Sequence, residues 1–447
     1  MSAAVDAHAA RTVALAAELR KGAGAVGLAK DTSNLFRDRV PAERPRLDVS
    51  DLDHVLAVDA QNALVEAEAM VTYEDLVAAC LPQGVMPAVV SQLKTITLGG
   101  AVAGVGIEAT SHRHGLVHNT VREIEVLAAD GRVLTCTPTN EHADLFYGFP
   151  NSYGTLGYAL KVKAATIPVL PFVHVQHREF GKPGDFFTAL ERHCTSGDAT
   201  FIDGTVFAPD RLFITLGRFA AEAPRVSDYT FERIYYRSIP EKREDWLTTH
   251  DYLWRWDTDW FWCSKNVGAQ NPIVRRLYGK KRLGSRTYGK IMRWNARAGL
   301  SRLLNRVLGL HAESVIQDVD IPIGRAAEFL EFFHREIGIL PVWVCPIGAV
   351  PDADRFPLYP THRELYVNFG FWDVVKRRER HERGHFNRLV EGEVARLGGI
   401  KSLYSESFFT PDDFFARYGG EAYARLKAKY DPDRRFPTAY EKCVLRH

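Results

Sequence analysis

The chain has 447 residues, of which 46% are hydrophobic and 25% are charged, and its formal net charge is only +2. This composition is typical of a soluble globular protein with two or three domains. The near-neutral charge excludes a general affinity for nucleic acid, and no apolar run reaches the ~18 residues needed to cross a bilayer. The six scattered cysteines predict no metal site, and the lack of a signal peptide predicts a cytoplasmic protein.

The first 170 residues alternate between helical and strand-like patterns. Thr72 and Asp75 are spaced to cap a helix, and Asp130-Gly131 suits a two-residue turn with positive backbone dihedrals. The mixed order predicts an α+β domain over residues 1–170. The predicted helices are 8–21, 73–84 and 141–149, and the predicted strands are 25–29, two within 54–71, a hairpin over 122–137, and 154–169.

The character of the chain changes after Pro171, so we predict a second domain over residues 171–447. It begins with a hairpin over 200–220 and continues into an aromatic and basic region. Strands are predicted at 340–350 and 364–372, before a helical C-terminal stretch.

Two stretches fit the dinucleotide pattern G-x-G-x-x-G/A, at Gly22–Gly27 and Gly104–Ala109. The Rossmann mechanism requires a strand before the glycines and a helix after them. The first stretch has the reverse order, and the second runs into His112 and His114 rather than a clear helix. The segment 150–154 resembles a hydrolase elbow, but proline replaces its first glycine, and no Walker spacing is present.

Three glycine-bearing segments instead suit a long ligand with a pyrophosphate and two ring ends. The loop at 28–34 carries hydroxyl and amide residues, and such a loop can aim backbone N–H groups at an anion. The stretch 99–106 can lie beneath a ring, and 151–158 supplies the third segment. The alternative is that all three are only tight turns.

A resemblance to a known family rests on five segments that occur in order: "TLGGAVAGVGIEATSHRHGL", "EVLAADGRVLTCTP", "ADLFYGFPNSYGTLGYALKVKAATIP", "PVWVCP" and "FPTAYEKC". Together they resemble the sterol side-chain (delta-24) reductases, which are FAD flavoproteins of the vanillyl-alcohol-oxidase type. The resemblance implies an α+β fold, with a two-subdomain PCMH-type FAD-binding domain at 1–170 and a C-terminal substrate or cap domain at 171–447.

By position, the resemblance implies a pyrophosphate loop at 30–34, a segment along pyrophosphate and isoalloxazine at 97–115, and a closing segment at 155–158. Related oxidases often tether FAD through a histidine or cysteine in the first two segments, and both residue types are absent from the matching positions here. We therefore expect noncovalent FAD. The cofactor-binding residues that the resemblance implies are Lys30, Asp31, Thr32, Ser33, Asn34, Thr97, Leu98, Gly99, Gly100, Gly104, Val105, Gly106, Ile107, Glu108, Ala109, Ser111, His112, Gly115, Thr155, Gly157 and Tyr158.

The same resemblance implies reduction of an isolated carbon–carbon double bond, with NADPH as the electron donor. An unconjugated alkene is a poor hydride acceptor, so a workable route first protonates it to a tertiary cation, in a site that excludes water. The candidate proton donors are Glu108, His112, His114 and Tyr366. Each has a structural alternative, because the histidines can simply hydrogen-bond FAD and Tyr366 can be strand core.

Residues 260–312 contain twelve lysines and arginines and no aspartate or glutamate, with large apolar residues interleaved. This asymmetry favours a basic amphipathic surface that lies on anionic lipid, at the inner face of the membrane. A solvated basic helix pair or a site for the NADPH phosphate is the alternative. The cations assigned to the membrane surface are Arg275, Arg276, Lys280, Lys281 and Arg282.

The high alanine and arginine content indicates a GC-rich bacterial genome, in which sterol synthesis is unusual. A bacterial branch that resembles the sterol reductases saturates the methylene branch of 10-methylene fatty acyl chains, and this alkene also protonates to a tertiary cation. We therefore expect a methylene-fatty-acyl reductase that acts on phospholipid chains. The alternatives are a sterol side-chain reductase, an FAD-linked sugar or alcohol oxidase, and a non-catalytic lipid-binding module.

Overall fold

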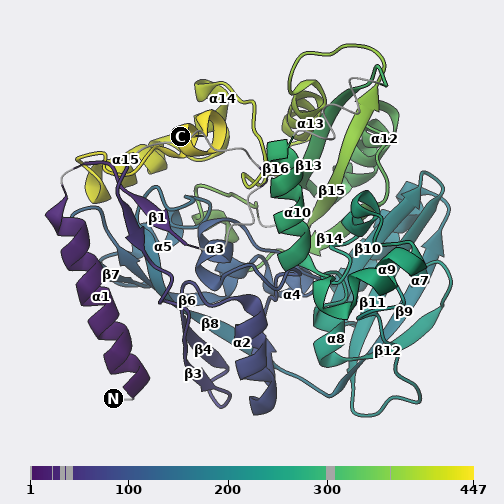
Figure 1. Cartoon of the computed structure of the whole chain (residues 1–447), viewed down its shortest axis with the longest axis horizontal. Coiled ribbons are helices and arrows are strands. Elements are labelled where there is room, and N and C mark those ends of the chain that lie inside the picture. Colours follow the sequence, from purple (N-terminus) through teal and green to yellow (C-terminus); the bar gives the residue numbers. More distant parts are fainter. Residues whose placement is uncertain are drawn as a thin grey trace.

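The computed structural model describes residues 3–22, 24–30, 36, 44–298, 308–362 and 364–446. Helices and antiparallel sheets alternate along the chain and confirm the α+β class (Figure 1). Among the described residues, no helix is long and apolar enough to cross a bilayer.

The first sheet has the strand order β3-β4-β8-β6-β7, and β5 pairs with the far end of β8. A separate parallel pair, β1 and β2, lies beside it. The strands are β1 (Gly27–Ala29), β2 (Arg46–Asp48), β3 (Val55–Asp59), β4 (Leu64–Glu68), β5 (Val85–Pro87), β6 (Val121–Leu127), β7 (Val133–Cys136) and β8 (Tyr158–Pro168). The helices of this half are α1 (Ala3–Lys21), α2 (Tyr73–Cys80), α3 (Leu98–Ala103), α4 (Ser111–His114) and α5 (Ala143–Gly148).

Local signals in this half predicted the longer elements, but β2, β5, α3 and α4 were not predicted and one turn differs. Thr72 caps α2 by accepting a hydrogen bond from the amide of Asp75 at 3.2 Å. The β6–β7 hairpin forms as predicted, but only Gly131 has a positive φ, of 81°. The amide of Ala128 donates to the carbonyl of Arg132 at 2.9 Å, so residues 129–131 connect the strands in a longer turn than the predicted two-residue type.

The second sheet has eight strands in the order β12-β9-β11-β10-β14-β15-β13-β16. Its strands are β9 (Phe172–Phe180), β10 (Phe201–Ala208), β11 (Arg211–Ala220), β12 (Glu244–Thr248), β13 (His311–Pro322), β14 (Val342–Ile347), β15 (Tyr366–Arg377) and β16 (Ile400–Lys401). The helices are α6 (Pro183–Ser196), α7 (Tyr235–Ser238), α8 (Thr249–Leu253), α9 (Pro272–Tyr278), α10 (Ser285–Ala298), α12 (Ala326–Glu336), α13 (His385–Arg396), α14 (Pro411–Arg417) and α15 (Gly420–Tyr430).

Both faces of this second sheet are buried, and alternate residues of each strand serve different cores. Along β15, Val367, Phe369 and Phe371 pack into the core under α6, α12 and α13. Tyr366 and Trp372 point to the opposite face, which belongs to the core shared with the first half. The sheet therefore presents a second set of side chains toward the first half of the molecule.

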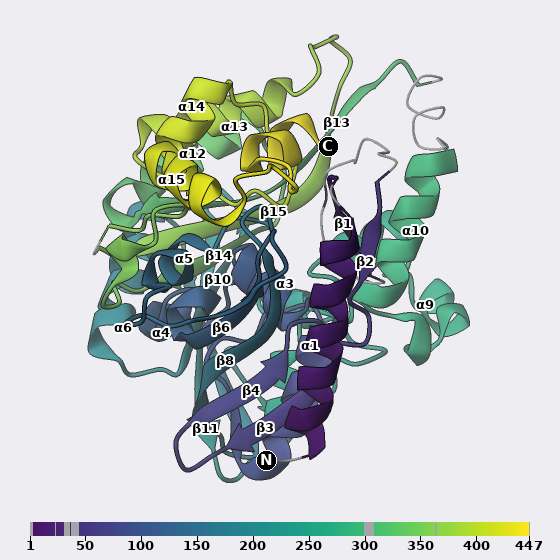
Figure 2. The same cartoon turned by 90° about the vertical axis from the view of Figure 1, so that its left-hand side faces the viewer.

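The C-terminal segment, which the sequence grouped with the second domain, returns to the first half. Helix α15 lies beside α5 in both views (Figures 1 and 2). Lys427 donates to the carbonyl of Thr155 at 2.8 Å, and Arg435 donates to the carbonyls of Leu19 and Ala129 at 2.8 and 2.7 Å. These bonds tie the end of the chain to the end of α1.

Helix α1 docks on the first sheet through a buried charged cluster. His8 lies between Glu68 and Glu125, at 2.8 and 2.9 Å, and Arg11 also pairs with Glu68 at 2.8 Å. Burial by itself would lower the pKa of His8, but the hydrogen bonds and charges of the two carboxylates outweigh it and raise the pKa to about 9.

The raised pKa makes the docking of α1 sensitive to alkaline pH. His8 contributes its full stability below its ordinary pKa of 6.5, and this contribution is lost as the pH rises to about 9. We expect the free energy of unfolding to fall by up to ~3 kcal/mol over this window. The measurement is urea denaturation of wild type and His8→Gln at pH 6.5 and 9.5, with exposed His311→Gln as the control. A pH dependence equally steep in His8→Gln would contradict this assignment.

Candidate functional site

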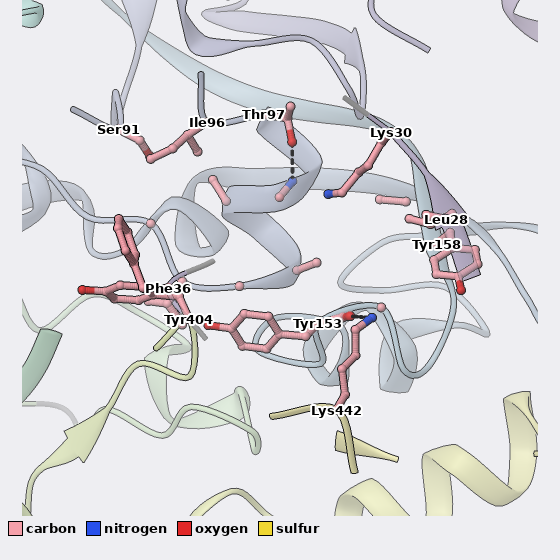
Figure 3. Close-up of a pocket in the computed structure, with 18 of the residues that line it drawn as sticks. Leu28, Lys30, Phe36, Ser91, Ile96, Thr97, Tyr153, Tyr158, Tyr404 and Lys442 are labelled. Carbon is pink, nitrogen blue, oxygen red and sulfur yellow. Dashed lines mark hydrogen bonds between the residues drawn. The ribbon is translucent and has the colours of Figure 1, made fainter. Parts of the chain in front are cut away.

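A cavity of about 570 Å³ lies between the first half, the second sheet and the C-terminal segment (Figure 3). Its floor is α3 and the loop that follows, from Thr97 to Ile107. Strands β1 and β2 close one end, while β13 and β15 contribute Asp318 and Trp372 at the other. The site is therefore built from segments that are far apart in the sequence.

One end of the cavity is cationic. Lys30, Arg44 and Arg46 come from β1, β2 and the residues beside them, and Figure 3 shows Lys30 near Leu28 and Tyr158. Lys442 and Arg446 add two cations from the C-terminal segment, and Lys442 donates to the carbonyl of Tyr153 at 2.5 Å. Five cations against one carboxyl group among the described lining residues favour an anionic ligand.

The opposite end is aromatic. Phe36 packs on Trp260 with ring centroids 5.3 Å apart, and Phe261 packs on Trp372 at 4.3 Å. Trp260 and Phe261 both have left-handed backbone conformations, with φ of 45° and 59°. Such conformations in bulky residues cost of order 1 kcal/mol each and concentrate at functional sites.

The floor presents backbone donors to the cavity. The amides of Val105, Gly106 and Ile107 have no acceptor among the described residues, and neither does the buried Nε2 of Gln92. A buried donor without a partner costs about 1–3 kcal/mol, so these groups await a ligand with acceptor atoms.

Two glycines that line the cavity lie in tight contact with the protein behind it. A Cβ at Gly106 would lie 2.6 Å from Val117, and a Cβ at Gly157, where φ is 149°, would lie 2.5 Å from Val126. Both glycines are needed for close packing against the protein behind the floor.

The structure brings part of the predicted cofactor set together. The predicted residues that line the cavity are Lys30, Thr97, Gly100, Gly104, Val105, Gly106, Ile107, Gly157 and Tyr158. Those that lie outside its lining are Leu98, Gly99, Glu108, Ala109, Ser111, His112, Gly115 and Thr155. Asp31, Thr32, Ser33 and Asn34 lie outside the described residues.

None of the four predicted proton donors lines the cavity. The Glu108 carboxylate is buried and accepts from Arg255 at 2.7 Å, while Asp203 on β10 accepts from the same guanidinium at 2.8 Å. Burial raises the pKa of Glu108 even though Arg255 opposes the shift. Glu108 therefore joins the two halves of the molecule instead of facing the cavity.

The other three predicted donors are displaced for separate reasons. His112 donates from Nδ1 to the carbonyl of Ala109 at 2.9 Å, and burial lowers the pKa of His112 to about 4. Burial also lowers the pKa of His114, so both rings are neutral at pH 7. Tyr366 shares a sheet face with Trp372 but stands six residues away, or ~20 Å along the strand.

Sequence reasoning missed the cavity residues that come from the second half. These are Asp318, Trp372 and Tyr404, whereas Trp260 and Phe261 belong to the aromatic stretch 252–262, which was predicted to line an apolar entrance or to form an aromatic belt. The signal available for Asp318 was the alternation in "SVIQDVDIP", where Asp318 and Asp320 occupy one face of a strand that is apolar on the other. A buried strand with two acidic positions indicates a functional face.

The basic segment forms α9 and α10, but one of its predicted cations is buried. Arg275 is only 2% exposed and forms a bidentate ion pair with Asp259, at 2.6 and 2.9 Å. It therefore anchors α9 and does not belong to a membrane surface. Arg276, Lys280, Lys281 and Arg282 are exposed. Residues 299–307 of this segment lie outside the described residues.

Residues 11–137 match the family model of an FAD binding domain. The chain carries an FAD-binding domain. This match covers Lys30, Arg44 and Arg46 of the cationic end, the floor of the cavity and the first sheet as far as β7. The domain is of the PCMH type, and the protein is an FAD-dependent oxidoreductase.

The chain is similar along most of its length to the Delta(24)-sterol reductases. It is 25% identical over 405 residues to that of Homo sapiens, covering 87% of this chain and 75% of the relative. It is 24% identical over 434 residues to that of Arabidopsis thaliana, covering 89% and 76%. Decaprenylphosphoryl-beta-D-ribose oxidase of Mycolicibacterium smegmatis is 32% identical, but over only 126 residues, 28% of this chain and 26% of that protein.

The groups in the cavity fit FAD. Lys30, Arg44 and Arg46 suit its pyrophosphate, and the free amides of the floor suit the polar edge of its ring system. The described lining residues include no histidine or cysteine, so noncovalent binding stays our prediction.

Removal of two cations from the pyrophosphate end should weaken FAD binding. We expect Arg44→Gln/Arg46→Gln to lower the affinity about tenfold, with Arg122→Gln/Arg132→Gln on the exposed face of the hairpin as the control. Titration of apoprotein with FAD measures the affinity, and acid precipitation of the wild type measures tethering. Equal affinity in the test variant would contradict the assignment, and flavin retained in the wild-type pellet would contradict noncovalent binding.

Proposed function

We propose that this protein is an NADPH-driven, FAD-dependent reductase of an isolated carbon–carbon double bond in a lipid. The observation that carries the proposal is the polarity of the cavity. Its cationic end suits the cofactor phosphates, and its aromatic end suits an uncharged, apolar substrate. Similarity to Delta(24)-sterol reductases over 87% of the chain supports reduction of an alkene as the reaction.

An isolated alkene requires both a hydride and a proton, and the aromatic end favours this chemistry. When bound, FAD supplies the hydride after NADPH has reduced it. Trp260, Phe261 and Trp372 exclude water from the substrate and present ring faces that stabilise a developing cation. An alcohol or sugar substrate would leave its hydroxyl groups poorly matched at this end.

We favour the methylene branch of a 10-methylene fatty acyl chain on a phospholipid as the substrate, with the 10-methyl chain as the product. Protonation of the exocyclic methylene carbon gives a tertiary cation at C10, which is the same chemistry as reduction of a sterol side chain. The Delta(24)-sterol reductase relatives favour a sterol as the second candidate.

The substrate class can be tested with the purified, FAD-loaded protein. We expect NADPH to bleach the flavin under anaerobic conditions, and phosphatidylglycerol that carries a 10-methylene-octadecanoyl chain to restore it as the 10-methyl chain forms. Mass spectrometry of the lipid detects a gain of two hydrogens. A Δ24-unsaturated sterol is the parallel substrate, and its exclusive reduction would favour the second candidate. Rapid hydrogen peroxide formation without reduction of either alkene would contradict the proposal.

A lipid substrate requires access from a bilayer, and α9 and α10 form a suitable surface. Ile273 and Leu277 lie four residues apart on α9 and are 71% and 78% exposed, and Trp294 on α10 is 60% exposed. The cations Lys280, Lys281 and Arg282 lie between the two helices. Figures 1 and 2 place α9 and α10 on one side of the molecule, so we propose that this side lies on the anionic inner leaflet.

Reversal of the three cations between the helices should abolish binding to anionic vesicles. Because each cation near such a surface contributes ~1 kcal/mol, we expect Lys280→Glu/Lys281→Glu/Arg282→Glu to lower binding at least about a hundredfold. The control reverses three exposed cations elsewhere, Lys376→Glu/Arg378→Glu/Arg380→Glu. Co-sedimentation with phosphatidylglycerol vesicles at low and high salt measures binding. Equal loss in both variants would show that the effect is one of net charge and not of this surface.

A further inference from the structure

Asp318 is the only carboxylic acid among the described residues that line the cavity. It lies on β13, next to the aromatic residues Trp372 and Tyr404. Its Oδ1 atom is buried and has no hydrogen-bond partner among the described residues. A buried, unpartnered carboxylate oxygen is costly, and the cost falls when the group carries a proton.

The strand opposite Asp318 makes room for its carboxyl group. Gly370 on β15 is the partner of Asp318 in the β13–β15 ladder. A Cβ at this position would lie 2.6 Å from Oδ1 of Asp318 and 2.5 Å from the ring of Trp372. Glycine at position 370 therefore allows the acid and the aromatic ring to share one end of the cavity.

Tyr404 lies beside Asp318 and is held in place by Trp372. The indole Nε1 of Trp372 donates to the hydroxyl oxygen of Tyr404 at 2.9 Å, so the phenolic proton of Tyr404 stays available to Asp318. Tyr404 itself is a poor acid, because burial raises the pKa of its phenol. It serves as a positioning residue.

The neighbouring Asp320 is fully bonded, in contrast to Asp318. Asn368 donates to its Oδ1 and Tyr359 donates to its Oδ2, both at 2.7 Å. Burial raises the pKa of Asp318 to about 8, the Tyr404 hydrogen bond opposes the shift, and the charge of Asp320 adds to it. The pKa of Asp320 rises only to about 6, since its two donors oppose burial.

We propose that Asp318 is the catalytic residue that protonates the substrate double bond. The inference rests on the proposed function and names the acid that this reaction needs. The proposal rests on three geometric observations. Asp318 is the only carboxyl group among the described residues that line the cavity, Gly370 leaves space for it, and its Oδ1 atom has no hydrogen-bond partner among those residues.

The step balances in atoms and electrons. The O–H bond of Asp318 breaks as the π pair of the alkene forms a new C–H bond at the less substituted carbon. The adjacent carbon becomes a tertiary cation and takes two electrons as hydride from the reduced cofactor, which is thereby oxidised. Asp318 is left as a carboxylate, which stabilises the cation until hydride arrives, and water then returns its proton.

The rate of alkene reduction should depend on pH, because only the protonated form of Asp318 can donate a proton. The titratable groups that face Asp318 are Asp320 on its own strand and Tyr404 from the loop after β16. Tyr153 from the first half points toward Tyr404 (Figure 3). Lys442 is the cation next to Tyr153. At pH 7 Asp318 holds its proton, and alkene reduction should fall about tenfold per pH unit above about 8.

The test separates alkene reduction from flavin reduction in the FAD-loaded protein. We expect Asp318→Asn to lower reduction of the 10-methylene chain and of the Δ24-sterol at least a hundredfold, while NADPH bleaches the flavin at the wild-type rate. Asp318→Glu should restore part of the activity with a displaced alkaline limb. Asp373→Asn, on the neighbouring strand and paired with Lys265 outside the cavity lining, is the matched control.

The protonation state of Asp318 can also be measured without catalytic turnover. Infrared difference spectra between pH 6 and 10 should show a protonated carboxyl band that is lost near pH 8 in wild type and in Asp373→Asn, and that is missing in Asp318→Asn. Retained alkene reduction in a folded, flavin-loaded Asp318→Asn protein would overturn the assignment but leave the proposed function standing. Wild type that reduces no lipid alkene, while the infrared band behaves as expected, would overturn the proposed function.

Discussion

The burial of both faces of the second sheet is the constraint on which the site depends. One face needs apolar residues for the helices α6, α12 and α13, and the other must match the first half of the molecule. Alternation along each strand satisfies both demands, because successive side chains point to opposite faces. Asp318 and Trp372 therefore reach the cavity from strands whose other residues form an ordinary apolar core.

Charged groups connect the two halves around this cavity. Arg255 bonds Glu108 from the loop after α3 and Asp203 from the second sheet, in a fully buried cluster. Burying two carboxylates and one guanidinium costs desolvation free energy. The cluster is stable only if its hydrogen-bond geometry is fixed accurately. The cluster thus favours one arrangement of the floor against the sheet that faces it.

The two halves of the molecule contribute different chemical groups to the cavity. The first half supplies cations and unpaired amides for a cofactor that carries phosphates, and the second half supplies aromatic rings and a carboxyl group for the substrate. The family match covers residues 11–137 of the first half, and the similarity to the sterol reductases covers 87% of the chain and so includes much of the second half.

Local signals predicted most of the elements, whereas the cofactor was predicted from the resemblance to a known family. The Thr72 cap, the β6–β7 hairpin and the glycine-rich floor depend on neighbours within a few residues, and these interactions are visible in the sequence. The membrane cations were predicted from charge alone, and the buried Arg275 was wrong because its partner Asp259 lies sixteen residues earlier. Tertiary structure decided which way each polar side chain faces.

The sequence by itself determined an α+β chain, because periodicity, caps and turns are properties of adjacent residues, and its resemblance to the sterol reductases predicted that the first half binds FAD. Only the tertiary structure decided which acid reaches the cavity. Glu108 follows the cofactor floor but is turned toward Arg255, whereas Asp318, some two hundred residues later, is brought in by the pairing of β13 with β15. Contacts of this kind depend on which strands become neighbours, and no local pattern records that.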